Sequence, residues 1–442
     1  MAGIQDLVEK LNSIHPARVA IIGGGYAGMA AAVALSARGI PVTIYESAKQ
    51  LGGRARGLER NGARLDNGQH ILLGCYHDTL QLIEQVGGNI GQDFLRLPLQ
   101  LTLHNRFEFK AANFPAPFHL LSGLMTASGL SLRQRLSASR FMLTLRRMRF
   151  AITQDITALD FLRARQQDQD LIRLLWEPIC VAALNTPIDK ASARVLLNVL
   201  RDSLNGARAD SDMLLSRLDF SALFPNRAAD YVERNGGSVR LACGVDAIVP
   251  RETGIELHTA HGAEHFTYAI CAASPSSAAQ LLEKTETLTP IAAQIRALEF
   301  QPIYTVYLQY PDDVSLPHPM LGLDRGCSQW LFDKGQIDGQ YGLIAAVISA
   351  EGAHQQLEQT ALAQRVAQEL REQFDIVATP LWHQVIAEKR ATFCCQPNLD
   401  RPSQITPVDR LLLAGDYTSG DYPATLEGAV MSGLRCAAAI QD

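Results

Sequence analysis

Short runs of consecutive apolar residues, separated by stretches with helical periodicity, mark both ends of the chain. Residues 19–22 and 42–45 are apolar or β-branched throughout, which predicts two buried strands. The alanine-rich stretch between them predicts a helix packed closely on those strands. The same strand-like composition recurs at 267–275, 304–310, 341–348 and 411–414. Residues 358–374 predict an amphipathic helix, so the pattern as a whole indicates an α/β protein.

The turn between the first strand and its helix has the spacing Gly23-x-Gly25-x-x-Gly28. Gly23 permits a tight turn, Gly25 leaves room for a pyrophosphate, and Gly28 lets the helix approach the sheet. Free N–H groups at the helix start favour phosphate groups. Glu46 follows the second strand, where its carboxylate can accept hydrogen bonds from a ribose. Together these features predict a dinucleotide site rather than a glycine-rich loop that serves packing alone.

A second glycine pair follows directly, in Leu51-Gly52-Gly53-Arg54. It resembles the second motif of the superfamily of FAD-binding amine oxidases and phytoene desaturases. The resemblance implies that Gly52 and Gly53 lie against the cofactor and that Arg54 meets a phosphate or the flavin edge.

A third element lies near the C-terminus, where a strand-like run ends in Gly415-Asp416 and a helix is expected to start at Thr425-Leu426. The same resemblance implies that Asp416 holds the ribityl chain of FAD. It also implies that the helix start faces the pyrimidine end of the flavin, and that the backbone of Val245 holds the adenine. Three matched elements favour FAD over a freely exchanging nicotinamide cofactor.

The distribution of these elements predicts a two-domain flavoprotein. A discontinuous, Rossmann-like FAD-binding domain would comprise residues 1–100, 225–290 and 386–442. An α+β substrate-binding domain, threaded between its pieces, would comprise residues 101–224 and 291–385. A chain of 442 residues is long enough for two such cores.

Composition and charge narrow the function classes. With 40 Lys plus Arg and 45 Asp plus Glu, the net charge is −5, which argues against a nucleic-acid partner. The eight cysteines form no CxxC pair and no metal-like cluster, so most are expected to be buried and reduced, and no metal site is expected. Residues 1–17 lack the apolar core of a signal peptide, and no run of eighteen apolar residues occurs. We therefore expect a cytoplasmic protein.

One segment, residues 109–154, combines apolar and basic side chains. No Asp or Glu occurs in it. Its cations are Lys110, Arg133, Arg135, Arg140, Arg146, Arg147 and Arg149. Its apolar side chains include the run 114–125 and a helical stripe formed by Leu132, Leu136, Leu143 and Phe150. The hypothesis is a segment that rests on the inner face of the cell membrane and admits an apolar substrate. The alternative is an ordinary helix with a solvated basic face.

Four stretches, 66–76, 176–187, 191–202 and 414–430, together resemble the hydroxysqualene dehydroxylase family, also called squalene-associated FAD-dependent desaturases. The resemblance spans about residues 18 to 436, with Ser216 standing where a proline is expected. It implies reductive conversion of hydroxysqualene into squalene, by hydride transfer from N5 of reduced FAD to the carbon that loses water. It also implies a lipophilic isoprenoid substrate, a role in squalene and hopanoid synthesis, and the other squalene-synthesis enzymes as partners.

Loss of water needs a proton donor near the hydroxyl. His70 is the first candidate, because its unperturbed pKa of about 6.5 suits proton donation, and Tyr422 is the second. Each has a plainer interpretation: His70 as a hydrogen-bond partner of the cofactor, Tyr422 as a wall of the site. Glu177 is the third group considered, and its carboxylate could serve as a helix-start group and no more.

Two other oxidoreductase functions stay open. A flavin amine oxidase usually carries a lysine near the flavin, but Lys190, Lys284 and Lys334 stand in no telling motif. A carotenoid-type desaturase would run hydride in the opposite direction, which the sequence does not determine. A non-catalytic flavoprotein is disfavoured because the flavin motifs are complete.

Overall fold

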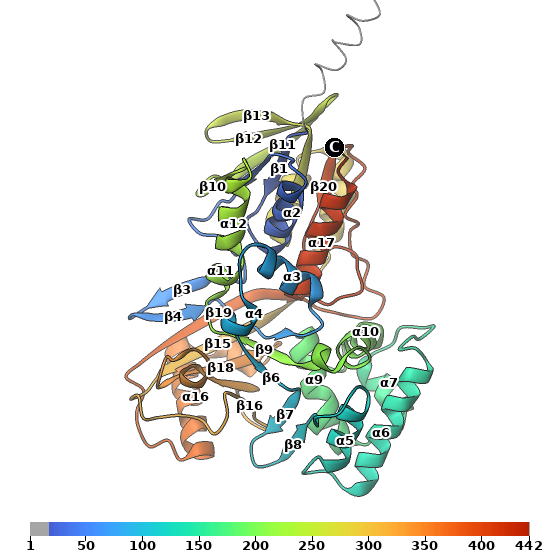
Figure 1. The fold of residues 1–442 in the computed structure, drawn as a ribbon, viewed down its shortest axis with the longest axis vertical. Helices are drawn as coiled ribbons and strands as arrows, with labels where there is room; N and C mark the ends of the chain where they lie inside the picture. The colour runs from blue at the N-terminus through green and yellow to red at the C-terminus, as the bar shows by residue number, and fades with distance from the viewer. Residues whose placement is uncertain (1–16, 442) are drawn as a thin grey trace, which may run out of the picture.

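The structure is a computed structural model that describes residues 17–441. The expectation about a signal peptide falls on residues 1–16, which lie outside the described part. Figure 1 shows two halves, and the upper one combines segments from both ends of the chain. There β1 (Val19–Ile22) and α2 (Tyr26–Ala37), in blue, lie beside α17 (Leu426–Ala439), in red.

Across residues 17–441, five parallel strands form the sheet of the upper half, in the order β10-β2-β1-β14-β20. The other four strands are β2 (Val42–Tyr45), β10 (Ser238–Arg240), β14 (Tyr268–Cys271) and β20 (Leu411–Leu413). They come from three separated parts of the chain, as a discontinuous FAD-binding domain requires.

The side chains of β1 alternate between two layers, because successive residues of a strand point to opposite faces. Val19 and Ile21 pack with the helices α2, α12 (Pro225–Arg234) and α17. Ala20 and Ile22 face the other layer, an antiparallel sheet. That sheet consists of β11 (Val245–Arg251), β12 (Gly254–Thr259) and β13 (Gly262–Phe266).

The lower half contains a seven-stranded sheet in the described chain, with the order β19-β15-β18-β17-β16-β7-β8. Its strands are β7 (Gln100–Leu103), β8 (Phe107–Lys110), β15 (Phe300–Gln309), β16 (Met320–Gly322), β17 (Trp330–Asp333), β18 (Leu343–Ser349) and β19 (Trp382–Phe393). The amphipathic helix α16 (Gln359–Phe374) covers one face. The opposite face, which includes Tyr307 and Val347, belongs to the large core shared with the rest of the protein.

A group of helices lies beside this sheet at the lower right of Figure 1. It comprises α5 (Phe118–Thr126), α6 (Leu132–Arg147), α7 (Ala158–Ala164), α8 (Gln169–Leu171), the π-helical turn η1 (Ile172–Trp176), α9 (Glu177–Leu184) and α10 (Ala193–Leu204). Among residues 17–441, no helix is long and apolar enough to cross a membrane.

Shorter elements connect the halves. They are β3 (Gly57–Arg60), β4 (Ala63–Asp66), β5 (Leu72–Leu73), α3 (His77–Gln85), α4 (Ile90–Asp93), β6 (Phe94–Leu97), β9 (Met213–Ser216), α11 (Phe220–Leu223), α13 (Pro275–Leu282), α14 (Thr289–Arg296) and α15 (Lys334–Asp338). All eight cysteines are free thiols, and all but the half-buried Cys327 are buried.

The structure confirms the α/β class, and one expected domain boundary falls inside a strand. Residue 386 was expected to begin the last FAD-binding segment, but it lies inside β19. That strand pairs with β15 from Trp382 to Phe393, so it belongs to the seven-stranded sheet as one unit.

Candidate flavin and substrate cavities

The two glycine-rich turns lie against each other at the end of β1. Gly23 has a φ of +111°, and a Cβ there would lie 2.5 Å from the carbonyl oxygen of Ala272. A Cβ on Gly28 would lie 2.0 Å from the carbonyl oxygen of Gly23, so α2 approaches the turn as closely as the sequence predicts. Gly25 pairs with Gly52 in a parallel bridge. The turns form a cradle that side chains would fill.

Glu46 is fixed at the end of β2 by backbone donors. Its Oε2 accepts a hydrogen bond from the Gly24 N–H at 2.7 Å, and its Oε1 accepts one from the Ala48 N–H at 2.8 Å. Oε1 also accepts from the Ser47 hydroxyl at 3.3 Å, which leaves a further lone pair on Oε2. Glu46 therefore keeps acceptor capacity for ribose hydroxyls while its position is set.

Arg54 and Asp416 form an ion pair across the site. Arg54 Nη2 lies 2.5 Å from Asp416 Oδ1, and Arg54 Nη1 donates to the carbonyl oxygen of Ala391 on β19. Asp416 is buried, and Gly415 before it has a φ of +152°. The pair joins the LGGR turn to the end of β20, so two motifs 362 residues apart share one site.

Helix α17 begins where the sequence predicts. The hydroxyl of Thr425 accepts a hydrogen bond from the Gly428 N–H at 3.1 Å and caps the helix. The Glu427 carboxylate instead caps α3, accepting from the N–H groups of Asp78 and Thr79 and from the Thr79 hydroxyl. The Glu427 side chain therefore stabilises the start of α3, and the backbone at Leu426 faces the site.

These elements surround a cavity of about 770 Å³, which we call the flavin cavity. The size is in the range of cofactor sites. The predicted residues that line it are Gly23, Gly25, Glu46, Gly52, Gly53, Arg54, His70, Val245, Gly415, Asp416, Thr425 and Leu426. Gly28 lies beneath the first turn and acts through packing. The cradle, the carboxylate, the ion pair and the helix start fit FAD.

The sequence did not single out every polar group of this cavity. Gln69 Oε1 and His70 Nδ1 are buried and have no hydrogen-bond partner among the described protein atoms. Both residues line the flavin cavity. Buried polar atoms are normally satisfied, so these two suit the polar edge of a bound cofactor. Gln69 stands beside His70 in the stretch 66–76, which was the available signal.

His70 is surrounded by other groups, and its ring packs against that of Phe220 at 4.8 Å between centroids. Burial, with a smaller contribution from the positive charge of Arg54, lowers the pKa of His70 to about 4. The ring is therefore neutral near pH 7 and carries no extra proton to give. This favours the interpretation of His70 as a hydrogen-bond partner of the cofactor.

The depressed pKa of His70 predicts a pH dependence of stability. An unfolded histidine titrates near 6.5, so between about pH 6.5 and 4 the unfolded chain binds the extra proton and stability falls as pH falls. His70 should contribute up to about 3 kcal/mol of this loss. Chemical unfolding at several pH values should show a shallower slope for His70→Gln than for the wild type. The same substitution at the exposed His261 is the control. Equal slopes would contradict the burial of His70.

A second cavity, of about 180 Å³, adjoins the first, and we call it the apolar cavity. Its wall consists mainly of aliphatic and aromatic side chains from β7, β8, α5, α6, α9 and α10. The two cavities share lining residues: Ile71, Tyr76, Ala182, Ala183, Trp330 and Thr425. Tyr422 lines the apolar cavity, whereas His70 lines the flavin cavity. The two predicted acids are therefore not in the same cavity.

The remaining candidate groups lie elsewhere. Glu177, at the start of α9, does not line either cavity, and burial raises its pKa. Lys334 forms a buried ion pair with Asp338, and Lys190 pairs with Glu351. Lys284 lines the flavin cavity, but its Nζ donates to the carbonyl oxygen of Asp246, next to Val245. No other lysine in the described chain lines either cavity.

A Rossmann-like sheet, a dinucleotide cradle and an adjoining apolar cavity define the class of FAD-dependent oxidoreductases. The chain belongs to the family of flavin containing amine oxidoreductases, whose family pattern matches residues 26–441. The protein is thus an FAD-dependent oxidoreductase.

Similar proteins agree with this class. The hydroxysqualene dehydroxylase of Sinorhizobium fredii is 27% identical over 438 residues, covering 96% of this chain and 98% of the relative. The zeta-carotene desaturase of Arabidopsis thaliana is 24% identical, covering 96% and 85%. A solved oxidoreductase from Methanosarcina mazei has the same fold, with a TM-score of 0.73 at 15% identity, covering 95% and 99%. The resemblance to hydroxysqualene dehydroxylases is therefore confirmed over nearly the whole chain.

Proposed function

We propose that the protein reductively removes the hydroxyl group of hydroxysqualene to give squalene, in squalene and hopanoid synthesis. The observation that carries this proposal is the apolar cavity, which shares a wall with the flavin cavity. The names of relatives that cover the whole chain support it. An apolar cavity beside a flavin suits a hydrocarbon chain that carries its reacting carbon to the cofactor.

Bound FAD in its reduced form supplies a hydride. Residues of the protein exclude water from the site and orient the substrate. Ile71, Trp330 and the alanines of α9 exclude water where the two cavities meet, which protects a developing carbocation from capture by solvent. The N-terminus of α17, at Thr425, carries positive partial charge, which would stabilise the negative charge of reduced FAD. Tyr422 stands in the apolar cavity, and burial raises its pKa, so it serves as a hydrogen-bond donor to the leaving hydroxyl rather than as a strong acid.

The carotenoid-type desaturase is the second candidate, because zeta-carotene desaturases match nearly the whole chain. An apolar cavity suits a polyene precursor equally well, so the two functions differ in the direction of hydride flow. The amine oxidase is disfavoured, since the single lysine of the flavin cavity, Lys284, is engaged beside the predicted adenine end.

Anaerobic flavin absorbance separates these functions. Mixing the enzyme in its reduced form with hydroxysqualene in detergent should restore the oxidised flavin spectrum, and squalene should not. The absorbance of the oxidised flavin should not change when amines or a C40 polyene precursor are added. Bleaching of the oxidised enzyme by either compound, with no response of the reduced enzyme to hydroxysqualene, would transfer the function to the matching alternative.

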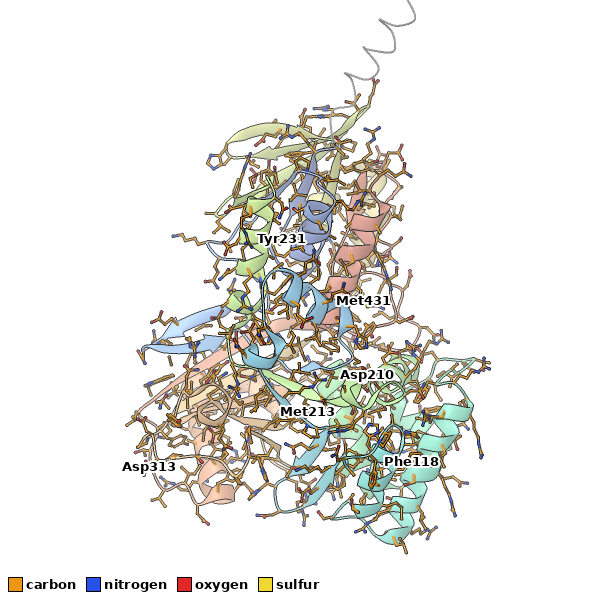
Figure 2. The ribbon with its side chains drawn as sticks, in the orientation of Figure 1. Phe118, Asp210, Met213, Tyr231, Asp313 and Met431 are labelled. Carbon is orange, nitrogen blue, oxygen red and sulfur yellow. The ribbon has the colours of Figure 1, made fainter. Side chains whose placement is uncertain are left out.

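We also propose that residues 109–154 dock the protein on the cytoplasmic face of a membrane. Phe114, Phe118, Leu132, Leu136 and Leu143 are exposed, between 38% and 63%. Figure 2 labels Phe118 in the helical group, away from the five-stranded sheet. Phe150 is a correction to the predicted stripe. It is buried, because α6 ends at Arg147 and the chain turns at positive φ through 149 and 150.

The exposed patch and the apolar cavity belong to the same two helices. Leu120 and Leu124 of α5 and Met142 of α6 line the cavity, while other residues of these helices are exposed. Burying a chain of about thirty carbons is favourable by on the order of 20 kcal/mol relative to water. Such a substrate does not arrive through solution, so a membrane contact beside its cavity provides a route.

Vesicle flotation tests this docking. The wild type should float with anionic vesicles at low salt, because the arginines of α6 add to the apolar contact. The double variant Phe118→Ser/Leu132→Ser should lose most of this binding. Val377→Ser/Leu381→Ser, which removes two equally exposed apolar side chains elsewhere, should float like the wild type. The docking surface would be refuted if the two double variants floated equally well. It would also be refuted if the wild type did not float with the vesicles.

A further inference from the structure

The apolar cavity has one polar corner. Asp202, at the end of α10, and Tyr422, before α17, both line it. Three other hydroxyl groups of its wall are used locally: Ser203 donates to the carbonyl oxygen of Val199, Ser211 to that of Arg208, and Thr425 to that of Pro423. The hydroxyl-bearing Tyr76 stands on the wall shared with the flavin cavity. A half-buried carboxylate and a half-buried phenol in a mainly apolar wall need an explanation, because polar groups taken from water carry a desolvation cost.

Arg201 fixes the carboxylate. Its Nε donates to Asp202 Oδ1 at 2.6 Å and its Nη2 donates to Oδ2 at 3.1 Å, a bidentate arrangement. The Arg201 side chain is 38% exposed and that of Asp202 is 22% exposed, so the pair lies between solvent and the cavity. Two parallel hydrogen bonds hold the carboxylate in one orientation, with lone pairs left for a further donor.

The Tyr422 hydroxyl lies beside this carboxylate. Burial, and then the charge and hydrogen bonding of Asp202, raise the pKa of Tyr422 well above its ordinary value. Tyr422 therefore stays protonated and is a donor. Without substrate the Tyr422 hydroxyl is directed at Asp202. An alcohol that enters between them replaces this contact with one hydrogen bond to the carboxylate and one from the phenol.

We propose that Asp202 and Tyr422 bind the hydroxyl group of the substrate, with the alcohol O–H donating to Asp202 and the alcohol oxygen accepting from Tyr422. The inference rests on the proposed function, since it assumes an apolar polyisoprenoid alcohol. Arg201 is a positioning residue, because it acts through Asp202. The arrangement distinguishes substrate from product: the hydrocarbon product makes neither hydrogen bond, so it binds more weakly and leaves.

Ligand binding to the oxidised, FAD-loaded enzyme tests the inference without turnover. Trp176 and Trp330 line the apolar cavity, so quenching of tryptophan fluorescence reports occupancy by hydroxysqualene or squalene. The wild type should bind hydroxysqualene at least tenfold more tightly than squalene. Tyr422→Phe and Asp202→Ala should each weaken hydroxysqualene binding by roughly tenfold, as expected for a lost hydrogen bond. Squalene binding should change less than about twofold, which also shows that the cavity is intact.

The hydroxyl site would be overturned if the variants lost affinity for hydroxysqualene and squalene equally. It would also be overturned if both variants kept the wild-type preference for hydroxysqualene. Tyr422→Phe keeps the ring and carries the test if Asp202→Ala fails to fold. Asp230→Asn, on the exposed side of α12, is the matched control and should behave as wild type. Squalene formation by the wild type together with unchanged preference in the variants overturns this inference alone. Absence of any hydroxysqualene binding or turnover in the wild type overturns the proposed function with it.

Discussion

Asp416→Ala is expected to yield protein without bound FAD. Asp416 is buried at the end of β20 and lines the flavin cavity, where the family resemblance assigns it to the ribityl chain. The substitution removes that acceptor and leaves Arg54 without its ion-pair partner. Breaking such a pair by removing one member is strongly destabilising, by about 3–5 kcal/mol when fully buried. The flavin-to-protein absorbance ratio of the purified variant measures the effect.

The control must separate loss of the cofactor from loss of the fold. Circular dichroism should show that Asp416→Ala keeps its secondary structure, and Asp230→Asn should keep both fold and flavin. If purified Asp416→Ala contained as much FAD per protein as the wild type, the assignment of Asp416 to the ribityl chain would be contradicted. An unfolded Asp416→Ala would leave Asp416→Asn to decide, since that variant keeps an acceptor of the same size.

Gly28→Ala is expected to abolish stable folding of the FAD-binding half. In an ordinary helix interior, alanine is more stable than glycine by about 1 kcal/mol. Here the new Cβ would lie 2.0 Å from the carbonyl oxygen of Gly23 and 3.2 Å from Cβ of Ala272. The clashing oxygen belongs to backbone held at a φ of +111°, so it cannot move cheaply. Overpacking of this kind costs about 1–3 kcal/mol or more, and the cradle for FAD is lost with it.

Thermal unfolding and flavin content measure this prediction. Gly91→Ala in α4 is the matched control, because the nearest atom to its new Cβ is Asn89 Oδ1, at 3.4 Å. That variant should unfold within a few degrees of the wild type. The close packing of α2 on the turn would be refuted if the Gly28→Ala protein were as stable as the wild type and retained its flavin.

The flavin site was predictable because its motifs are local. Gly23, Glu46, Asp416 and Thr425 each end or begin an element within a few residues of a recognisable pattern, and the structure brings these separate elements to one cavity. Strand and helix boundaries around them follow from short apolar runs. The expected boundary at 386 falls inside β19, because this strand is long and carries no break in composition at that point.

The apolar cavity was not predictable in the same way. Its wall joins side chains from many elements, separated in the sequence, whose order in space follows from tertiary packing. Asp202 looks like an ordinary helix-end carboxylate in the sequence, and only the fold shows it beside Tyr422. His70 shows the complementary case. Its residue type suggests a proton donor, but the surrounding burial lowers its pKa to about 4, and burial is a property of the folded chain.

The most direct test of the central claim is the product of an anaerobic single turnover. The enzyme, with its FAD reduced beforehand, is incubated with hydroxysqualene in detergent, and the extract is analysed by mass spectrometry. The account predicts squalene, up to one molecule for each reduced flavin, and none with oxidised enzyme. Recovery of hydroxysqualene unchanged, from enzyme whose oxidised flavin is instead reduced by an amine or a C40 polyene precursor, would contradict it.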